Sequence, residues 1–288
     1  MTARVLFAGC RRVPEGTGDE DAVVRALTDA GAPTRWAVWD DPTVDFAAAE
    51  LVVLRATWDY SQRRDEFLAW CDTVPRLRNA ARVVRWNTDK RYLLDLAAAG
   101  LPIVPTALVE VGAGAHWPDG EFVVKPAVGA GASGARRFGP GDDELAARHL
   151  AELHADGRAA LVQPYQAHVD EHGETALVFV AGEYSHAFAK AALLAAAPGG
   201  PPAGVEELAP AEPSREYRTL AEDTLEASAE LLGVAPADLL YARVDVVTGD
   251  DGRPVLLELE LTEPYLGFTH ADPAAPSRFA SAVLDQLG

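Results

Sequence analysis

The sequence predicts an α/β protein that combines a parallel sheet near the N-terminus with an antiparallel sheet near the C-terminus. Residues 4–54 alternate apolar runs with a helical pattern, an order typical of a small parallel sheet covered by helices. Two later apolar runs, 241–247 and 254–260, flank a polar turn whose Asp-Gly supplies the positive φ of a tight hairpin. A chain of 288 residues is long for one core, so we expect two or three subdomains.

The composition indicates an ordinary globular protein and excludes two classes of partner. Hydrophobic residues make up 49% and charged residues 24% of the chain. No apolar run has the length of a membrane span or the form of a signal peptide, so we expect a cytoplasmic protein without a membrane partner. The net charge of −19 argues against nucleic acid, which needs a basic surface, but leaves a nucleotide site open.

Lysine and cysteine usage adds two further expectations. Of the 25 basic side chains only three are lysines, which singles out Lys90, Lys125 and Lys190. In a chain that otherwise prefers arginine, a retained lysine indicates a place for a compact ammonium, although chance retention would look the same. Cys10 and Cys71 fit no metal-binding spacing, so we expect buried free thiols.

The N-terminal elements follow from short apolar runs and one amphipathic repeat. Val23, Val24 and Leu27 recur at helical spacing, and Gly31 ends this helix at its C′ position. The helix is expected over 19–30, and the strands around it over 4–8, 34–39 and 51–54.

Polar groups follow directly after the strand at 51–54. Arg55, Thr57 and Asp59 stand at the carboxyl end of a parallel strand, where open α/β sheets usually bind ligands. One interpretation is a substrate pocket that uses these three side chains. The alternative, given equal weight, is a capped helix start with a packed Trp and Tyr.

A helix is predicted over residues 88–100, with Thr88 as its N-cap and Gly100 as its stop. Lys90 then falls in the first turn, where the helix dipole favours anions and not cations. A polyphosphate that reaches this turn would explain the lysine. Pro102 and Pro105 mark the passage into a new unit.

A strand at 121–126 carries Lys125 and leads into a glycine-rich loop. The loop contains Gly129, Gly131, Ser133 and Gly134, so its backbone amides can close on phosphate oxygens with Ser133 as an extra donor. It matches neither of the two common nucleotide loops. Alone it fits a flexible hairpin turn equally well, and the lysine before it makes the signal more specific.

The remaining elements are read from periodicity and turn residues. Helices are expected at 142–155, 214–232 and 274–287, and strands at 159–162, 174–180 and 183–190. Gln163, Pro164, Tyr165 and Gln166 form a stiff connection that is consistent with a hinge. Residues 193–213 are rich in Ala, Pro and Gly and are expected to form a mobile lid.

Three carboxylates and a guanidinium are predicted to share one face of the C-terminal hairpin. Residues i and i+2 lie on the same strand face, so Arg243 projects with Asp245, and Glu258 with Glu260. Burying such charge is costly unless something compensates it. Mg²⁺ would do so, since it is a hard cation usually held by a few carboxylates plus substrate phosphates.

Taken together, these motifs resemble the ATP-grasp superfamily over about residues 86–265. Within it the chain is most similar to the cycloserine-forming ligases (O-ureido-D-serine cyclo-ligases) and the glutathione-synthetase-like group around them. The closer match rests on the segments 55–60, 85–90 and 258–264. Many members carry Asn where this chain has Glu260, which adds negative charge and leaves open whether one or two metal ions bind.

The resemblance implies a fold, cofactors and partners. The fold would be an ATP-grasp fold with a Rossmann-like pre-ATP-grasp domain at 1–100, a small central α+β domain at 101–165 and a C-terminal antiparallel-sheet domain at 166–288. The cofactors would be ATP and Mg²⁺, with Mn²⁺ as a substitute. The partner would be a small amino-acid-like substrate, and relatives are often homodimers.

The resemblance also implies a role for each site residue. Arg243 and Lys190 would be catalytic, and Asp245, Glu258 and Glu260 would bind the metal. Nucleotide contacts would come from Lys90, Lys125, Gly129, Gly131, Ser133, Gly134, Gln163, Pro164 and Tyr165, with ribose at Asp170 or Glu171. Substrate contacts would come from Arg55, Thr57, Asp59 and Glu263.

The implied function is ATP-dependent joining of a carboxylate and an amine. ATP would phosphorylate the carboxylate and the amine would attack the acylphosphate, within one molecule where a ring is closed; such transfer depends on positioning and charge neutralisation. Two alternatives remain: a small-molecule kinase, whose acceptor keeps the phosphate, and a nucleotide-binding protein without turnover.

Overall fold

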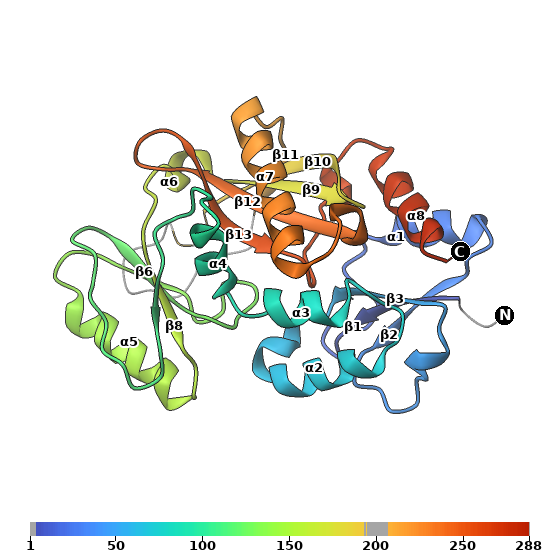
Figure 1. The fold of residues 1–288 in the computed structure, drawn as a ribbon, viewed down its shortest axis with the longest axis horizontal. Helices are drawn as coiled ribbons and strands as arrows, with labels where there is room; N and C mark the ends of the chain where they lie inside the picture. Colours follow the sequence, from blue (N-terminus) through green and yellow to red (C-terminus); the bar gives the residue numbers. More distant parts are fainter. Residues whose placement is uncertain (1–3, 193, 195–206, 288) are drawn as a thin grey trace.

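Three sheets, each formed by a successive part of the chain, make up the computed structural model of the protein (Figure 1). The structure describes residues 4–192, 194 and 207–287. The first sheet is parallel, and the central and C-terminal sheets are antiparallel. This arrangement confirms the predicted fold class.

The N-terminal sheet has the order β2-β1-β3-β4. Its strands are β1 (Val5–Gly9), β2 (Thr34–Val38), β3 (Leu51–Ala56) and β4 (Leu77–Arg78). Around it lie the helices α1 (Asp21–Asp29), α2 (Arg64–Thr73) and α3 (Ala81–Asn87) and the short 3₁₀ helices η1 (Phe46–Ala48) and η2 (Trp58–Gln62). Strands β1 and β3 are apolar along nearly their whole length because both faces of this sheet are covered.

The helix predicted over 88–100 is two shorter helices in the structure. Helix α3 ends at Thr88, which is its C-cap and not an N-cap, and α4 covers Tyr92–Ala98. Tertiary hydrogen bonds explain the break: the Asn87 amide donates to the Leu259 carbonyl, and the backbone N–H of Lys90 donates to the Ala127 carbonyl. Lys90 is therefore held between two sheets instead of in a helical turn.

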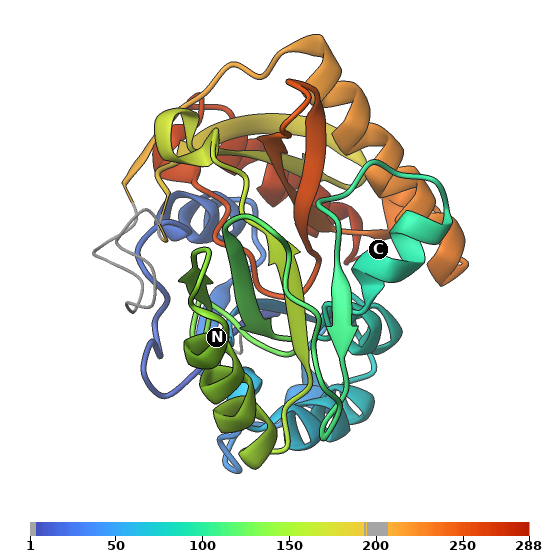
Figure 2. The same cartoon turned by 90° about the vertical axis from the view of Figure 1, so that its left-hand side faces the viewer.

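The central sheet forms a separate lobe, at the left of Figure 1. Its order is β5-β8-β6-β7, from β5 (Ala107–Val109), β8 (Ala160–Pro164), β6 (Phe122–Pro126) and β7 (Arg136–Phe138). Helix α5 (Asp143–Ala155) covers one face and buries Leu150 and Leu153 against Phe122 and Phe138. Figure 2 shows this lobe from its own side, in front of the C-terminal sheet.

The C-terminal sheet has the order β11-β10-β9-β12-β13. Its strands are β9 (Glu174–Val180), β10 (Glu183–Lys190), β11 (Leu208–Pro210), β12 (Tyr241–Thr248) and β13 (Pro254–Glu260). Helix α7 (Arg215–Leu232) packs on β12 and β13, and α8 (Ala275–Asp285) packs on α1. The short helices α6 (Val169–His172), η3 (Pro236–Asp238) and η4 (Phe268–His270) complete it.

The lid predicted over 193–213 lies mainly outside the described residues. Where the structure does describe this segment, Leu208–Pro210 form β11, which pairs with β10. The prediction missed this strand because three residues carry too little periodicity. The start of α7 follows the prediction, since the Ser214 hydroxyl accepts a hydrogen bond from the Tyr217 backbone N–H.

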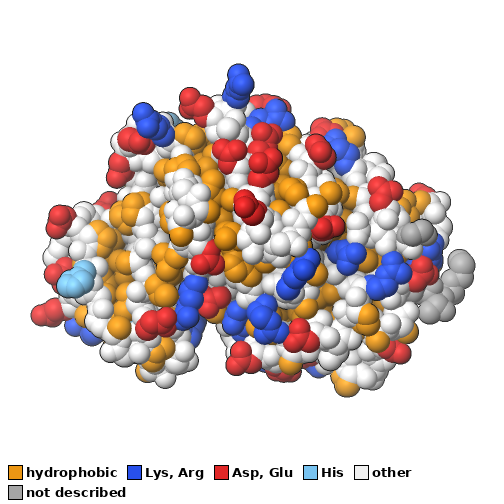
Figure 3. All heavy atoms as spheres, viewed as in Figure 1, with side chains coloured by type: hydrophobic (Ala, Val, Ile, Leu, Met, Phe, Trp, Pro, Cys, Tyr) orange, Lys and Arg blue, Asp and Glu red, His pale blue; other side chains and the backbone are white. Residues whose placement is uncertain are grey.

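The surface view shows charged side chains of both signs among apolar atoms, with a hollow beside the central lobe (Figure 3). Cys10 and Cys71 are buried free thiols, as predicted. Within the part of the chain that the structure describes, no helix is both long enough and apolar enough to cross a membrane.

Candidate active site

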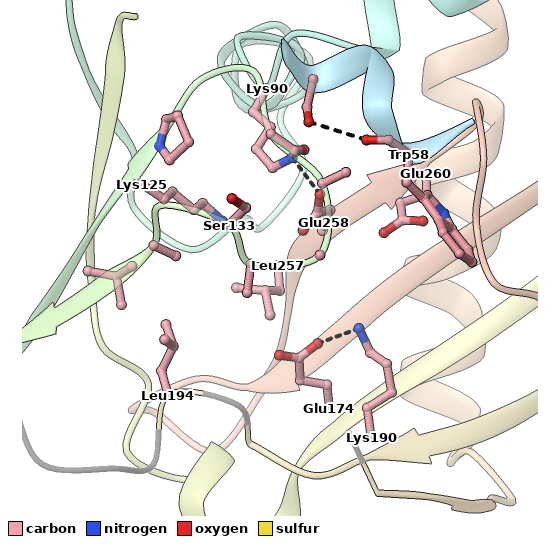
Figure 4. Close-up of a pocket in the computed structure, with 18 of the residues that line it drawn as sticks. Trp58, Lys90, Lys125, Ser133, Glu174, Lys190, Leu194, Leu257, Glu258 and Glu260 are labelled. Carbon is pink, nitrogen blue, oxygen red and sulfur yellow. Dashed lines mark hydrogen bonds and ion pairs between the residues drawn. The ribbon is translucent and has the colours of Figure 1, made fainter. Parts of the chain in front are cut away.

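A cavity of about 890 Å³ is lined by residues of the central and C-terminal sheets and by residues that follow strands β1 and β3 of the N-terminal sheet. Lys125 enters it from β6, Glu258 from β13, and Trp58 from η2 at the end of β3. Such a volume is ample for a small-molecule ligand. Figure 4 shows Lys90, Lys125 and Ser133 near Glu258, with Trp58 and Glu260 on another side of the cavity.

We call the side formed by Lys90, Lys125 and the glycine loop the cation wall. The Lys90 ammonium lies 2.9 Å from a Glu258 carboxylate oxygen and donates to the Gly129 carbonyl at 2.8 Å. Burial alone would lower the pKa of Lys90, but Glu258 and the other nearby carboxylates raise it. Lys90 is thus a cation with a fixed partner.

Lys125 is in a different situation. Among the described residues it forms no ion pair within 4.0 Å. Its pKa is lowered, first by burial and then by the ammoniums of Lys90 and Lys190, against the attraction of Glu258. A partly buried ammonium that lines the cavity without an ion-pair partner favours binding of an anion at this point.

The glycine loop follows β6 and reaches the cavity with Gly129, Gly131 and Ser133. Gly134 does not line the cavity. It has a φ of +80°, and a Cβ there would lie 3.3 Å from Pro126 Cδ, so this glycine serves the turn. The loop is therefore a tight turn, as one interpretation of its sequence predicted, and it also forms part of the cavity wall. Its contact with phosphate stays a prediction.

We call the opposite side, formed by Glu260, Glu263 and Asp59, the acid wall. In the β12–β13 register Arg243 lies opposite Glu260, and Asp245 lies opposite Glu258. Burial raises the pKa of Glu260 to about 7, against the attraction of Arg243, whose Nη2 lies 2.6 Å from a Glu260 carboxylate oxygen, and repulsion from Glu258 and Asp245 adds to the rise. Burial and the charge of Glu260 raise the pKa of Glu263 to about 8. The acid wall therefore holds its protons more tightly than ordinary carboxyls do, and a bound cation would favour its ionised form.

Asp245 differs from its expected position as a metal ligand. It is 1% exposed and does not line the cavity among the described residues. Its carboxylate accepts from Arg243 at 2.9 Å and from Lys190 at 2.7 Å, and these two cations lower its pKa despite burial. Asp245 thus lies behind the cavity and fixes the direction of Arg243 and Lys190, both of which line it.

Glu258 and Glu260 fit a divalent cation. Within the described residues no three acidic, histidine or cysteine side chains form a ready cage for a metal ion. Mg²⁺ does not require one, because it is commonly held by one or two carboxylates together with substrate phosphates. Both glutamates line the cavity, and the raised pKa of Glu260 indicates charge that a cation would relieve.

Some functional candidates were missed by sequence reasoning. Glu174 begins β9, lines the cavity and lies 2.7 Å from the Lys190 ammonium (Figure 4), and no local pattern marks it. Arg11 and Arg12 also line the cavity, just after β1. The rule that drew attention to the end of β3 would have found these two arginines, because β1 ends at the same edge of the sheet.

The three polar residues divide between the two interpretations of the segment, with Arg55 near the end of strand β3 and the other two after it. Asp59 lines the cavity, where it accepts from Trp39 Nε1 at 2.8 Å and from Arg63 at 2.9 Å. Arg55 and Thr57 are buried and do not line the cavity among the described residues. Thr57 precedes η2 but makes no capping bond with its side chain, so the structure places both residues in the packing beneath the site.

The connection after β8 contributes Gln163, Pro164 and Tyr165 to the cavity. Asp170 accepts from Arg137 and Tyr165. Glu171 is exposed and is not among the lining residues that the structure describes, so it lies away from the expected ribose position.

Comparison with known proteins identifies close relatives. Residues 5–82 match the model of the D-cycloserine synthetase DcsG N-terminal domain. The cycloserine biosynthesis protein DcsG of Streptomyces lavendulae is 39% identical over an alignment of 286 positions that covers 93% of this chain and 94% of that protein. A crystal structure of D-cycloserine synthetase DcsG superposes with a TM-score of 0.89 at 36% identity, covering 99% of both chains.

More distant structures share the fold. D-alanine–D-alanine ligase from Bacillus anthracis, solved in complex with ATP, has a TM-score of 0.67 at 14% identity, over 99% of this chain and 97% of that one. The ATP-grasp ligase PsnB, solved with Mg and ADP, has a TM-score of 0.62 at 16% identity over both whole chains. At these identities the likeness supports the three-sheet fold alone.

Proposed function

Because this chain belongs to the D-cycloserine synthetase DcsG family of ATP-grasp ligases, we propose that it uses ATP to close a ring within a small amino-acid-like molecule. ATP phosphorylates the substrate carboxylate, a nitrogen of the same molecule attacks the acylphosphate carbon, and ADP and phosphate leave. One observation supports the proposal most directly. A single cavity holds a lysine without an ion-pair partner in the described part of the chain, Lys125, on the cation wall and carboxyls with raised pKa on the acid wall.

The nucleotide lies against the cation wall in this proposal. Lys125 supplies the charge that a phosphate would neutralise, and Lys90 and Ser133 stand beside it. Gly129 and Gly131 let the loop backbone approach the phosphates. Gln163, Pro164 and Tyr165 form the side of the cavity that is suited to adenine.

Glu258 and Glu260 would hold Mg²⁺, or Mn²⁺ in its place, with the phosphates as further ligands. The metal, when bound, neutralises charge on the phosphoryl group that is transferred. Lys190 and Arg243, held by Asp245, direct positive charge to the same region and stabilise the oxyanion that forms at the substrate carbonyl.

The substrate lies toward the acid wall. Glu263 and Asp59 both line the cavity and offer carboxylates to a substrate ammonium, and Trp58 and Tyr265 bound the same side. A compact amino acid that carries its own nucleophile fits this combination of groups. Positioning by these residues replaces a protein nucleophile, since the reaction joins two groups of one molecule.

The test is turnover of O-ureido-D-serine, the substrate implied by the family, with ATP and Mg²⁺. We expect equimolar release of ADP and inorganic phosphate, and a cyclic product by mass spectrometry. D-Serine is the matched control because it has the carboxylate and amine without the ureido-oxy nucleophile. Phosphate retained on the acceptor would establish the kinase alternative, and absence of ADP would establish binding without turnover.

Two structural expectations belong to the same proposal. The division at 1–100, 101–165 and 166–288 agrees with the ranges of the three sheets and is supported by them. A homodimer is proposed on the family resemblance alone.

A further inference from the structure

The loop that follows β13 is held in an unusual way. Residues 261–266, which we call the β13 exit loop, contain neither helix nor strand, and five of the six are buried. Each of its six successive backbone carbonyls forms a hydrogen bond with a different side chain from elsewhere in the chain. In order along the loop the partners are Asn79, Tyr241, Trp58, Arg55, Arg243 and His186.

These partners come from both sides of the molecule. Asn79, Trp58 and Arg55 belong to the N-terminal part, and the other three belong to strands of the C-terminal sheet. Buried loop carbonyls need hydrogen-bond partners, but water or nearby backbone usually supplies many of them. A full set of side-chain partners instead fixes the path of the loop relative to two domains at once.

The loop also presents side chains to the cavity. Glu263 and Tyr265 line it, and the Glu263 carboxyl is hydrogen-bonded by Tyr60 of η2. Their neighbours Leu261 and Leu266 point into the core and are fully buried. Fixing the loop backbone therefore fixes where Glu263 stands in the acid wall.

Arg55 makes the shortest of the six contacts. Its Nη2 donates to the Pro264 carbonyl at 2.6 Å, and its Nε and Nη2 both lie 3.1 Å from Glu20 Oε1. The side chain has no exposed surface and stacks near the rings of Tyr241 and Phe279. The guanidinium is thus oriented by Glu20 and two aromatic rings, with one donor aimed at the loop.

We infer that Arg55 is a positioning residue for the substrate side of the reaction: through Pro264 it holds the β13 exit loop so that Glu263 meets the substrate. The inference rests on the proposed function, because it assumes that the substrate lies at the acid wall. Arg55 itself touches neither the cavity nor, in this proposal, the substrate.

The test is Arg55→Lys, which keeps a cation beside Glu20 but is too short and too differently shaped to hold Glu20 and Pro264 together. The matched control is Arg78→Lys. Arg78 also joins the N-terminal part to the C-terminal part, by donating to the Gln286 side chain at 2.8 Å, but it lies on β4 and does not touch the exit loop.

For Arg55→Lys we expect kcat/KM for O-ureido-D-serine to fall at least tenfold, while the Kd for Mg·ADP by calorimetry stays within twofold of the wild type. Arg78→Lys should keep both values. Equal losses for substrate and nucleotide, or kinetics equal to those of Arg78→Lys, would overturn the inference. Should Arg55→Lys fail to fold, Tyr241→Phe, at a residue outside the cavity lining that the structure describes, removes the hydroxyl that donates to the Thr262 carbonyl at 2.7 Å and should shift the same parameter in the same direction.

Hydrogen exchange separates failure of this inference from failure of the proposed function, because it needs no substrate. Amides of the exit loop should exchange faster in Arg55→Lys than in the wild type, and those of β6 and the glycine loop should not change. Arg78→Lys should leave the exit loop protected. Unchanged protection of the loop in Arg55→Lys would overturn the inference even if the wild type closes the ring as proposed.

Discussion

The cation wall and the acid wall of the cavity differ in how the free-energy cost of placing a charged carboxylate there is offset. On the cation wall Glu258 is paired with Lys90, and the lysines hold the pKa of this carboxyl at about 2 despite burial. On the acid wall burial raises the pKa of Glu263 to about 8, because the opposing effects of Tyr60 and Lys90 are too weak to offset it. The difference teaches that one wall has positive charge available for an anion, while the other has carboxyls whose ionisation a bound cation would favour.

This comparison also separates local from long-range causes. Glu258 and Glu260 are two residues apart on one strand face, yet their pKa values shift in opposite directions. The lysine that forms an ion pair with Glu258 comes from the break between α3 and α4, and Lys125, whose charge also lowers the pKa of Glu258, comes from β6. Charge balance in the cavity is therefore decided by the packing of three sheets.

The largest expected effect is loss of turnover in Glu258→Gln. The amide keeps the size of the side chain but removes the charge that meets Lys90 and the metal. Removing such an electrostatic contribution lowers kcat by about 10³-fold, which ADP release would measure. Asp250→Asn, on an exposed residue of the same hairpin, is the control and should keep wild-type turnover. A Glu258→Gln enzyme with near-normal kcat would remove Glu258 from the site.

A smaller effect, on affinity, is expected for Lys125→Met. A hydrogen bond to a charged group contributes about 1.5–3 kcal/mol, so the Kd for Mg·ADP should rise by about 10–100-fold in calorimetry. Without ligand, the free energy of unfolding should stay the same or rise, since the ammonium is buried without an ion pair among the described residues.

Lys90→Met provides the contrast to this prediction. It leaves the partly buried Glu258 without its partner and should lower the free energy of unfolding by about 1–3 kcal/mol, the cost of an unsatisfied polar group. Denaturant titration of the two variants would measure the difference. Equal destabilisation by both would show that the cation wall does not divide into a paired and an unpaired lysine.

The smallest effect is a pH dependence of stability that belongs to the acid wall. A carboxyl whose pKa is raised by folding binds protons more tightly in the native state, so its contribution is complete below about pH 4.5 and is lost as pH rises through the raised value. For Glu263 that value is about 8, so the ligand-free protein should lose stability between pH 7 and 8.5. Glu258 does not contribute there, because its pKa is lowered and its effect appears only in acid.

The measurement is the free energy of unfolding from denaturant titration at pH 7 and pH 8.5 for the wild type and for Glu263→Gln. The variant should show the smaller fall, because it has no carboxyl to ionise at this position. Mg·ADP should oppose the fall in the wild type, since a bound cation stabilises the ionised acid wall. Identical pH profiles for the two proteins would contradict the raised pKa of Glu263.

Much of the fold could be predicted because it depends on local patterns. Alternation of apolar residues, with Asp-Gly between the runs, placed the β12–β13 hairpin, and the repeat before Gly31 placed α1. The helix predicted over 88–100 failed because the Asn87 side chain bonds to the backbone of β13, about 172 residues away, a partner that no local pattern contains. Strand β11 was not predicted because a strand of three residues is too short to show a periodic pattern.

For the site, the sequence by itself determined which residue types stand together on each strand: the i and i+2 carboxylates of β13, the lysine of β6 and the glycines after it. Those features depend on chain geometry within a few residues. Only the tertiary structure decided that Asp245 turns to Arg243 and Lys190 behind the cavity, and that Glu174 enters it. It also decided that Arg55 reaches the Pro264 carbonyl, because hydrogen bonds and desolvation depend on which distant groups folding brings together.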